Sequence, residues 1–447
     1  MKRSHLHQRS RSSRRAFLRS STAAAVGLSL AGRSSVGASA PAETLALQGG
    51  KKAVTYPEDK HHDAARWPLY GPEDEKAVLE VLRKPSYQPL DDLEADWKEF
   101  YQVPYVKAQC NGTGALACLF FALDLPPGSE VMVPSYTFFA TIVPMRLSGL
   151  VPVFVDIDPR TLNFDLEDAR KRLTPRTRAI LPVHWFGNPC DMDHISDFAK
   201  EHGLIVLEDC AHAHCTSLKG KLMGTWGEMS IFSFQTTKPL PALEGGMGMY
   251  MKAEHYERAC CFGHYDQPKH FPENSPYRKY AGTGLGVKFR MHPLSAALAR
   301  VQLRRLKKRN ESGVKQVRSL NDRLIQLPGL HDQKSRPDAQ RLYYDANVLF
   351  IDPAAAGMSR ATAVKALRAE GVHASEFVYP LQHKMAIYRE KQWWHHPPVI
   401  PELPGSEQAN ATAIMLPYFT SDVPELVEQY VKAFEKVWAH RQALAKL

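Results

Sequence analysis

The chain has 447 residues, 44% of them apolar and 23% charged, a composition that predicts a globular protein with a large buried core divided between two domains. No stretch approaches the ~20 apolar residues that a membrane helix needs, so no membrane span is predicted. The net charge of +10 does not indicate nucleic-acid binding, because residues 1–38 contain eight Lys and Arg and no Asp or Glu, which leaves only +2 for the rest.

The basic head of the chain, residues 1–38, resembles a twin-arginine export signal. Arg14-Arg15 precede an Ala-, Ser- and Leu-rich stretch from residue 20 to 32, and small residues permit cleavage after Ala38. An organelle transit peptide is also Arg- and Ser-rich, but a compact apolar segment directly after paired arginines favours bacterial export. We therefore expect export in folded form, to the periplasm or the cell exterior of a bacterium.

Cysteine usage argues against a disulfide framework, because seven cysteines are sparse for an exported protein of this length and have no paired metal-binding spacing. We interpret them as structural and predict no metal site. They are Cys110, Cys118, Cys190, Cys210, Cys215, Cys260 and Cys261.

The first predicted elements are an irregular polar arm over residues 39–70 and two amphipathic helices, one from Pro72 and one around Trp97. A Gly- and Thr-rich stretch, residues 110–115, then opens an apolar helix that ends at Leu123. Small residues at a helix start leave amide groups open toward an anion, and the helix dipole adds to the attraction. The same pattern also occurs in ordinary helix caps.

Strands and helices alternate between residues 129 and 210, which predicts a mostly parallel sheet buried on both faces by helices. Polar and aromatic residues just past the carboxyl ends of such strands line the ligand crevice, and Phe138, His184 and Asp209 occupy positions of that kind. The expected strands are 130–133, 151–155, 179–183 and 204–207, and the expected helices are 166–173 and 192–202.

A lysine on a tight loop follows the next predicted strand, residues 231–234. Lys238 lies between hydroxyl residues and a proline, with Glu244, Gly245 and Gly246 behind it. A turn punctuated by glycine and proline holds a lysine by its backbone, which suits an amine that must form a Schiff base with an aldehyde. A solvated surface lysine is the alternative that this segment alone leaves open.

The C-terminal part predicts a smaller α+β domain over residues 306–447, after a large α/β domain over residues 71–305. The boundary lies inside a long amphipathic helix, residues 293–327, in which Gly313 marks a candidate break. The other predicted features are a loop over 263–285, a strand over 345–351, a helix over 359–370, a Pro-, His- and Trp-rich insert over 393–404 and a helix from residue 422.

Four pieces of this sequence match the needs of pyridoxal phosphate. The Gly/Thr helix start offers amides for its phosphate, and Phe138 offers a flat face for its ring. The carboxylate of Asp209 suits the pyridine nitrogen, and the amine of Lys238 suits the aldehyde. The set in this order on an α/β pattern is far more specific than any single piece.

The sequence resembles the DegT/DnrJ/StrS family of sugar aminotransferases, which are fold-type I pyridoxal-phosphate enzymes, from about residue 45 to residue 436. The matching stretches are NGTGAL (111–116), VPSYTFFAT (133–141), PVFVDIDPRTLN (152–163), TPRTRAILPVHWFGNPCDMD (174–193), VLEDCAHAH (206–214), FSFQTTK (232–238), EGG (244–246) and KFRMHPLSAALA (288–299).

The resemblance implies a role for each matching position. Lys238 would be the Schiff-base lysine, Asp209 the partner of the pyridine nitrogen and Phe138 the stacking aromatic. The amides of Thr113 and Gly114 would bind the phosphate, together with the hydroxyl of Ser233.

Two positions depart from the family pattern. His212 stands where the family usually has Gln near the ring hydroxyl, and it can still donate a hydrogen bond. Lys288 stands where the family often has an Asn that reaches the phosphate of the neighbouring subunit, which implies a homodimer with shared active sites. His184 and Glu244 match family positions to which we assign no role.

The resemblance implies a transaminase that moves an amino group from glutamate or glutamine to a keto-sugar or keto-cyclitol, either a nucleotide-linked ketosugar or a ketone such as scyllo-inosose. The family also contains dehydratases that use the same cofactor, but these replace the lysine with histidine, and Lys238 is present. A non-catalytic exported binding protein is a third reading, which the presence of both Lys238 and Asp209 disfavours.

Overall fold

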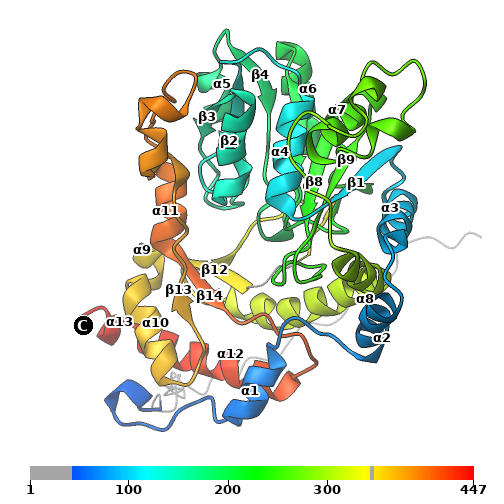
Figure 1. Cartoon of the computed structure of the whole chain (residues 1–447). Helices are drawn as coiled ribbons and strands as arrows, with labels where there is room; N and C mark the ends of the chain where they lie inside the picture. The colour runs from blue at the N-terminus through cyan, green and yellow to red at the C-terminus, as the bar shows by residue number, and fades with distance from the viewer. Residues whose placement is uncertain (1–42, 343–346, 447) are drawn as a thin grey trace, which may run out of the picture. The chain divides into compact units, whose positions relative to one another are not determined.

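A computed structural model describes residues 43–342 and 347–446, which belong to one compact unit (Figure 1). The export signal predicted over residues 1–38 lies outside the described residues. None of the helices in the described part combines the length and the apolar character that a membrane span requires.

The larger sheet has seven strands in the order β1-β9-β8-β5-β4-β2-β3. All run parallel except β9, which is antiparallel to both β1 and β8. The sequence prediction of a mostly parallel sheet is therefore confirmed. The strands are β1 Tyr105–Gln109, β2 Glu130–Pro134, β3 Val151–Val155, β4 Thr177–Ile180, β5 Ile205–Asp209, β8 Met229–Ser233 and β9 Gly246–Tyr250.

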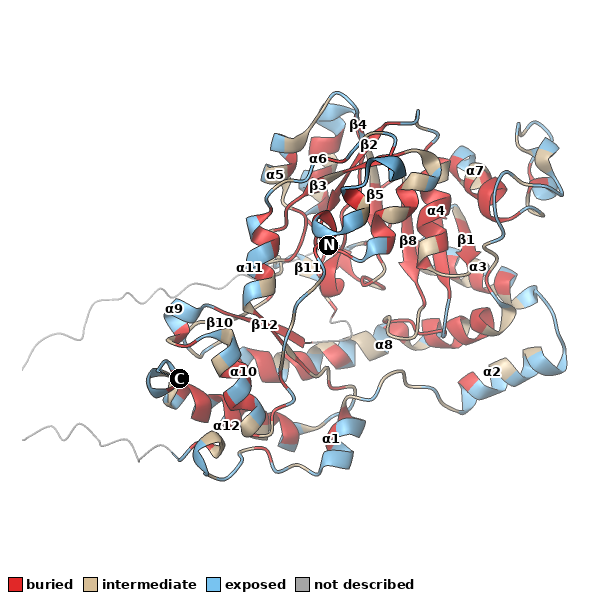
Figure 2. Cartoon of the chain, turned by 60° about the vertical axis from the view of Figure 1, so that its left-hand side comes forward, coloured by how far each residue is buried: buried red, intermediate tan, exposed pale blue. Residues whose placement is uncertain are grey.

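Helices cover both faces of this sheet, so most residues of its strands are buried (Figure 2). On β2, Val131 and Val133 face a core shared with α4, whereas Met132 faces the opposite core shared with α3 and α6. Alternate side chains of a strand point to opposite faces, which is why an almost continuous apolar run fits here. The helices around the sheet are α3 Gln88–Tyr101, α4 Gly112–Ala122, α5 Leu166–Arg172, α6 Met192–His202 and α7 Ala253–Gly263, and α2 Pro72–Arg83 packs on the long helix described below.

A second, antiparallel sheet in the order β10-β12-β14-β13 carries its own core on helices α10 and α12. The arm expected to be irregular over residues 39–70 contributes to this core through Leu45, Val54 and Ala64, the last of which ends a short helix, α1. The remaining elements are α1 Glu58–Ala64, β10 Leu330–Asp332, β12 Asn347–Ile351, α9 Pro353–Ala356, α10 Arg360–Ala369, β13 Ser375–Glu376, α11 Pro404–Thr412, β14 Ala413–Leu416, α12 Pro424–Ala439 and α13 Arg441–Leu444, with a small third sheet of β6 Ser217–Leu218, β7 Lys221–Leu222 and β11 Ala339–Gln340.

One long helix, α8 (Pro293–Leu324), lies against α2 and α3 at one end and α12 at the other (Figure 1). The candidate break near Gly313 does not occur, since α8 is continuous. Gly313 is buried, and a Cβ atom there would lie 1.5 Å from the Tyr418 hydroxyl oxygen. The glycine therefore permits the close approach of Tyr418. The division into two domains near residue 305, inside this helix, remains a prediction.

Candidate active site

A cavity of about 570 Å³ opens at the carboxyl ends of β5 and β8. The loop after β2, the start of α4 and the segment after β13 complete its wall. The structure brings together here six of the eight residues that the sequence predicted for cofactor binding. They are Asp209, Lys238, His212, Phe138, Thr113 and Ser233.

The carboxylate of Asp209 lies buried at the last residue of β5, with 4% of the residue exposed. One oxygen accepts a hydrogen bond from the Thr141 hydroxyl at 2.8 Å, and the other accepts from the Ala211 amide at 3.0 Å. Because Thr141 donates to Asp209, the Thr137 hydroxyl, 2.9 Å away, must donate to Thr141. Burial raises the pKa of Asp209. The site therefore contains a desolvated carboxylate that a cationic ligand group would stabilise.

The first turn of α4 and the end of β8 form a small cradle. The Asn111 side chain caps α4 by accepting from the Gly114 amide at 2.8 Å. Gly114 does not line the cavity and its N–H donates to Asn111, so its role as an amide donor to the phosphate remains a prediction. Gly112 and Thr113 line the cavity instead, and amides of a first helical turn have no carbonyl partner within the helix.

Glycines allow the parts of this cradle to converge. A Cβ atom at Gly112 would lie 3.0 Å from the Ser233 Cβ, and one at Gly246 would lie 2.7 Å from the Asn111 carbonyl. Larger residues would fill the space beside the amides and the Ser233 hydroxyl. The cradle thus has the size and the donors to hold a small anion.

Lys238 lies on a loop that its backbone closes tightly between β8 and β9. The Thr236 amide donates to the Leu243 carbonyl at 3.0 Å, and the Lys238 amide donates to the Gln235 carbonyl at 2.9 Å. The Gln235 side chain accepts from both the amide and the hydroxyl of Thr237. These bonds fix the base of the Lys238 side chain at the edge of the cavity.

Arg309 of α8 hydrogen-bonds to the backbone of the same loop. Its guanidinium donates to the Pro239 carbonyl, directly after Lys238, and to the Gln302 side chain at 2.5 Å. It also stacks over the Trp67 ring at 4.9 Å. Burial lowers the pKa of Arg309 to about 10, which leaves the guanidinium charged at neutral pH. Sequence reasoning missed this residue, because it lies 71 positions from the lysine and has no local motif.

Aromatic side chains make the remaining wall. The His212 ring lies edge-on to Trp185 at 5.1 Å and near Phe186 at 6.1 Å. Burial and the Lys238 cation lower the pKa of His212 well below its usual range, so the imidazole is neutral and can donate or accept. Tyr379 enters from beyond β13, and burial together with the Asp209 carboxylate raises the pKa of its phenol.

Two other residues singled out from the sequence lie elsewhere. His184 is fully buried and donates to Glu208 at 3.2 Å, while its other ring nitrogen accepts from the Cys190 amide. It therefore fastens the loop after β4 and does not face the cavity. Lys288 is exposed and does not line the cavity of its own chain, whereas Glu244 lies at the rim.

Besides Arg309, the residues not predicted individually include Gly112, Thr141 and Tyr379. Gly112 and Thr141 lie inside motifs that the sequence analysis quoted, and Thr141 stands three residues after Phe138, where a helical turn brings a hydroxyl round to the same side. Tyr379 carried no such signal, since packing of the second sheet brings it to the cavity.

Residues 70–435 match the DegT/DnrJ/EryC1/StrS aminotransferase family. The chain belongs to this family. Similar members include the GDP-perosamine synthase of Escherichia coli O157:H7, 30% identical over 74% of this chain and 85% of the relative, and the dTDP-4-dehydro-2,3,6-trideoxy-D-glucose 4-aminotransferase of Saccharopolyspora spinosa, 31% identical over 75% and 86%. The solved aminotransferase from Psychrobacter cryohalolentis superposes with a TM-score of 0.75 at 25% identity, covering 84% of this chain and 98% of that one.

This DegT/DnrJ/EryC1/StrS aminotransferase is a pyridoxal-phosphate-dependent transaminase. The site fits the cofactor, since the cradle at α4 would hold the phosphate, Asp209 the pyridine nitrogen and Lys238 the aldehyde. When bound, the cofactor supplies an electron-accepting ring that stabilises negative charge at a neighbouring carbon. Among the described lining residues Lys238 provides the only amine, so its Nζ is the group that can take up and return the proton at the reacting carbon.

Proposed function

We propose that the enzyme transfers the amino group of glutamate or glutamine to a ketone on a sugar or a cyclitol. The observation that carries this proposal is the convergence of Lys238 and Asp209 in one cavity of about 570 Å³, a volume in the range of small-molecule sites. The two relatives named above are both named for nucleotide-linked sugars, and this supports a carbohydrate as the amino acceptor. Lys238 also disfavours the dehydratase reading, which the resemblance associates with histidine at this position.

In this proposal most of the lining residues bind the cofactor, and Lys238 transfers the proton. Asp209, with Thr141 behind it, keeps a positive charge on the ring nitrogen, and His212 hydrogen-bonds the ring hydroxyl. Phe138, which is 52% exposed, covers the ring face. The α4 amides and Ser233 bind the phosphate, and Lys238 Nζ carries the proton.

A homodimer with shared sites belongs to the proposal. Lys238 is the only Lys or Arg among the described lining residues, so a bound phosphate and the carboxylates of a glutamate donor need counter-charges from elsewhere. Exposed Lys288 is the candidate that the family pattern indicates. The exposed rings of Phe138 and Phe139 at the cavity are consistent with cover from a second subunit.

Export by the twin-arginine route is also proposed, on the basis of Arg14-Arg15 and the apolar stretch behind them. A fusion of residues 1–45 to a reporter that works only when exported folded should be active outside the cytoplasm. Replacing both arginines with lysine should abolish that activity. Equal export of the lysine variant would refute the assignment. Export favours a free cyclitol or a cell-surface sugar as acceptor over a cytoplasmic nucleotide sugar.

The central experiment joins cofactor chemistry to an acceptor screen. Borohydride reduction of the purified enzyme, followed by peptide mapping, should find the cofactor attached to Lys238. Glutamate or glutamine should then bleach the visible absorption of the unreduced enzyme, and one keto-sugar or keto-cyclitol should restore it while gaining nitrogen. Cofactor attached to a different lysine, or an acceptor that loses water without gaining nitrogen, would overturn the proposal.

A further inference from the structure

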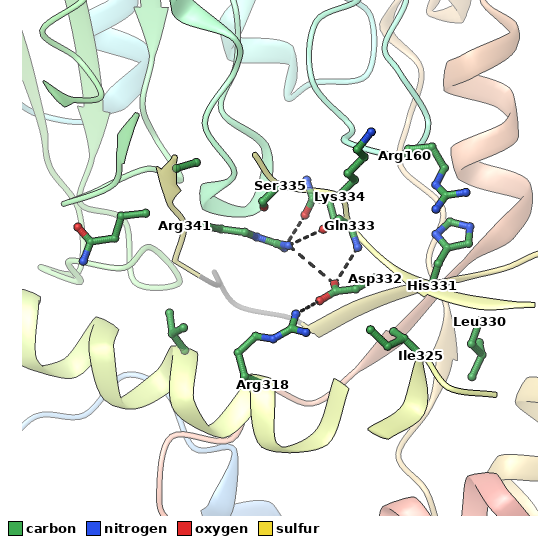
Figure 3. A pocket seen from close by; sticks show the side chains of 13 residues that line it. Arg160, Arg318, Ile325, Leu330, His331, Asp332, Gln333, Lys334, Ser335 and Arg341 are labelled. Atoms are coloured by element: carbon green, nitrogen blue, oxygen red, sulfur yellow. Dashed lines mark hydrogen bonds and ion pairs between the residues drawn. The ribbon is translucent and has the colours of Figure 1, made fainter. Parts of the chain in front are cut away.

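A second cavity, of about 700 Å³, lies between α8, the segment that carries β10 and the loop after β3 (Figure 3). Its lining shares no residue with the cavity that holds Lys238 and Asp209. The function proposed above does not use it. Four cationic side chains and one carboxylate line it, namely Arg160, Arg318, Lys334, Arg341 and Asp332.

The single carboxylate of this lining forms ion pairs with two of the arginines. Asp332 pairs with Arg318 at 2.5 Å and with Arg341 at 3.8 Å, as the dashed lines in Figure 3 show. Arg160 and Lys334 are exposed, and neither forms an ion pair with any acidic residue in the described ranges. Two positive charges at this rim therefore have no ion-pair partner among residues 43–342 and 347–446.

The backbone under these two cations is fixed. The Lys334 amide donates to the Arg160 carbonyl at 2.7 Å, which holds the two residues side by side. The buried Gln333 side chain donates to the carbonyls of Thr161 and Trp185, and the buried Asn188 side chain donates to the Lys334 carbonyl at 2.9 Å. Preorganised cations bind an anion at a lower entropic cost than cations on a mobile loop.

The floor beside the cations combines apolar and aromatic surface. The His331 ring stacks on Phe350 with centroids 5.3 Å apart and lies beneath Arg160 (Figure 3). Burial and the Arg160 cation lower the pKa of His331, so its ring is neutral and adds a hydrogen-bonding group without a charge. Ile325 and Leu330 line the same floor.

We propose that this cavity binds a small phosphorylated compound, whose phosphate is held by Arg160 and Lys334 and whose body rests on His331, Ile325 and Leu330. A phosphate dianion would neutralise both uncompensated cations, whereas a monocarboxylate would neutralise one. The planar guanidinium of Arg160 can bind two phosphate oxygens at once, and the ammonium of Lys334 serves as a point charge.

The test is calorimetric titration of the cofactor-loaded enzyme with inorganic pyrophosphate, because loading fills the phosphate cradle of the active site. Saturable binding at one site per chain is expected. The variant Arg160→Gln/Lys334→Gln should bind about tenfold or more weakly, since each substitution removes a charge-assisted hydrogen bond. The matched control Lys98→Gln/Lys365→Gln removes two exposed cations elsewhere on the protein, which form no ion pair with the other described residues, and should bind as the wild type does.

Equal affinity in the Arg160/Lys334 variant, or equal weakening in the control, would overturn the proposal. Absence of saturable binding by the wild type at about 0.15 M salt would overturn it too, because binding at lower ionic strength alone would reflect unspecific attraction. The Arg160/Lys334 variant should keep cofactor content and transamination unchanged. A loss of cofactor in that variant would mean general damage and would also count against a separate site.

Discussion

The Asp209 carboxylate depends on one hydroxyl for the placement of an oxygen, because Thr141 donates to Oδ2 at 2.8 Å. We expect Thr141→Val to lower kcat about 10- to 100-fold, the effect of losing one hydrogen bond to a charged group. Thr141→Ser should restore most of the activity. Steady-state kinetics and cofactor titration of both variants test this, and wild-type turnover by Thr141→Val would contradict the assigned contact.

Burial of Asp209 also predicts how stability depends on pH when the cofactor is absent. Its raised pKa means that the folded apoenzyme binds this proton more tightly than the unfolded chain does. The residue therefore contributes stability below the ordinary carboxyl range and loses that contribution as the pH rises through the raised pKa. The Asp209→Asn variant cannot ionise at this position, so its stability should not fall over this pH range.

Apo Asp209→Asn should accordingly melt roughly 2–4 °C above the apo wild type at neutral pH, with a smaller difference near pH 4. With cofactor bound, the wild type should melt at the higher temperature, because the protonated ring nitrogen pairs with the Asp209 carboxylate but gains no ion pair from the neutral amide of the variant. Calorimetric melting of both proteins, apo and loaded, measures the effect. A lower melting temperature of the apo variant at neutral pH would show that the buried charge is already compensated.

At the scale of elements, α8 positions the lysine loop through Arg309, which donates to the Pro239 carbonyl. Arg309→Met should lower kcat about 10- to 100-fold with little change in KM, since a hydrogen bond from a charged donor is lost and the loop can shift. Arg305→Met is the matched control, because Arg305 lies one turn away on α8 and pairs with Glu73 and Asp74 instead of the loop. The slowing should be absent from the control.

The rate of cofactor attachment distinguishes positioning from general stability. Borohydride trapping at Lys238 should be slower in Arg309→Met than in the wild type at equal cofactor concentration. Arg309→Lys, which keeps the charge but loses the planar fork that reaches two acceptors, should lie between the two. Trapping at the wild-type rate in Arg309→Met would contradict a role in placing the lysine.

How far the sequence predicts such elements depends on whether the signal is local. The strand that ends at Asp209 and the start of α4 follow from apolar runs and helix capping, and both were predicted. The conformation at Gly313 was misjudged, because the reason for that glycine is contact with Tyr418, more than a hundred residues away. Tyr379 and Arg309 reach the site by packing between distant elements, which no local pattern records.

At the scale of the whole molecule, the proposed dimer predicts that two inactive chains can complement one another. Lys238→Ala and Lys288→Ala homodimers should both be poorly active. If Lys288 serves the partner's phosphate, a mixed dimer has one site with both lesions and one with neither, and it should recover about half of the wild-type activity per dimer. Co-expression with two affinity tags provides the mixed species for assay.

If Lys288 acts within its own chain, every site of the mixed dimer carries one lesion and no intact site forms. An enzyme that is monomeric when fully active would contradict the shared site altogether. Lys288→Ala should also weaken cofactor retention by about 1.5–3 kcal/mol, the range for hydrogen bonds to charged groups.

The packing of the arm after residue 43 and helix α12 into one core has a consequence for the order of folding. Glu370 accepts from the Ala46 amide at 2.7 Å and from Lys436 at 2.9 Å, and the arm packs into the same cluster as α12. A ribosome that adds ~5–20 residues per second leaves the arm without this partner for tens of seconds. Closure of this core is therefore a late, long-range step, which slows folding. For a chain exported in folded form, as proposed, translocation must wait until the last helix has been made and has met the first.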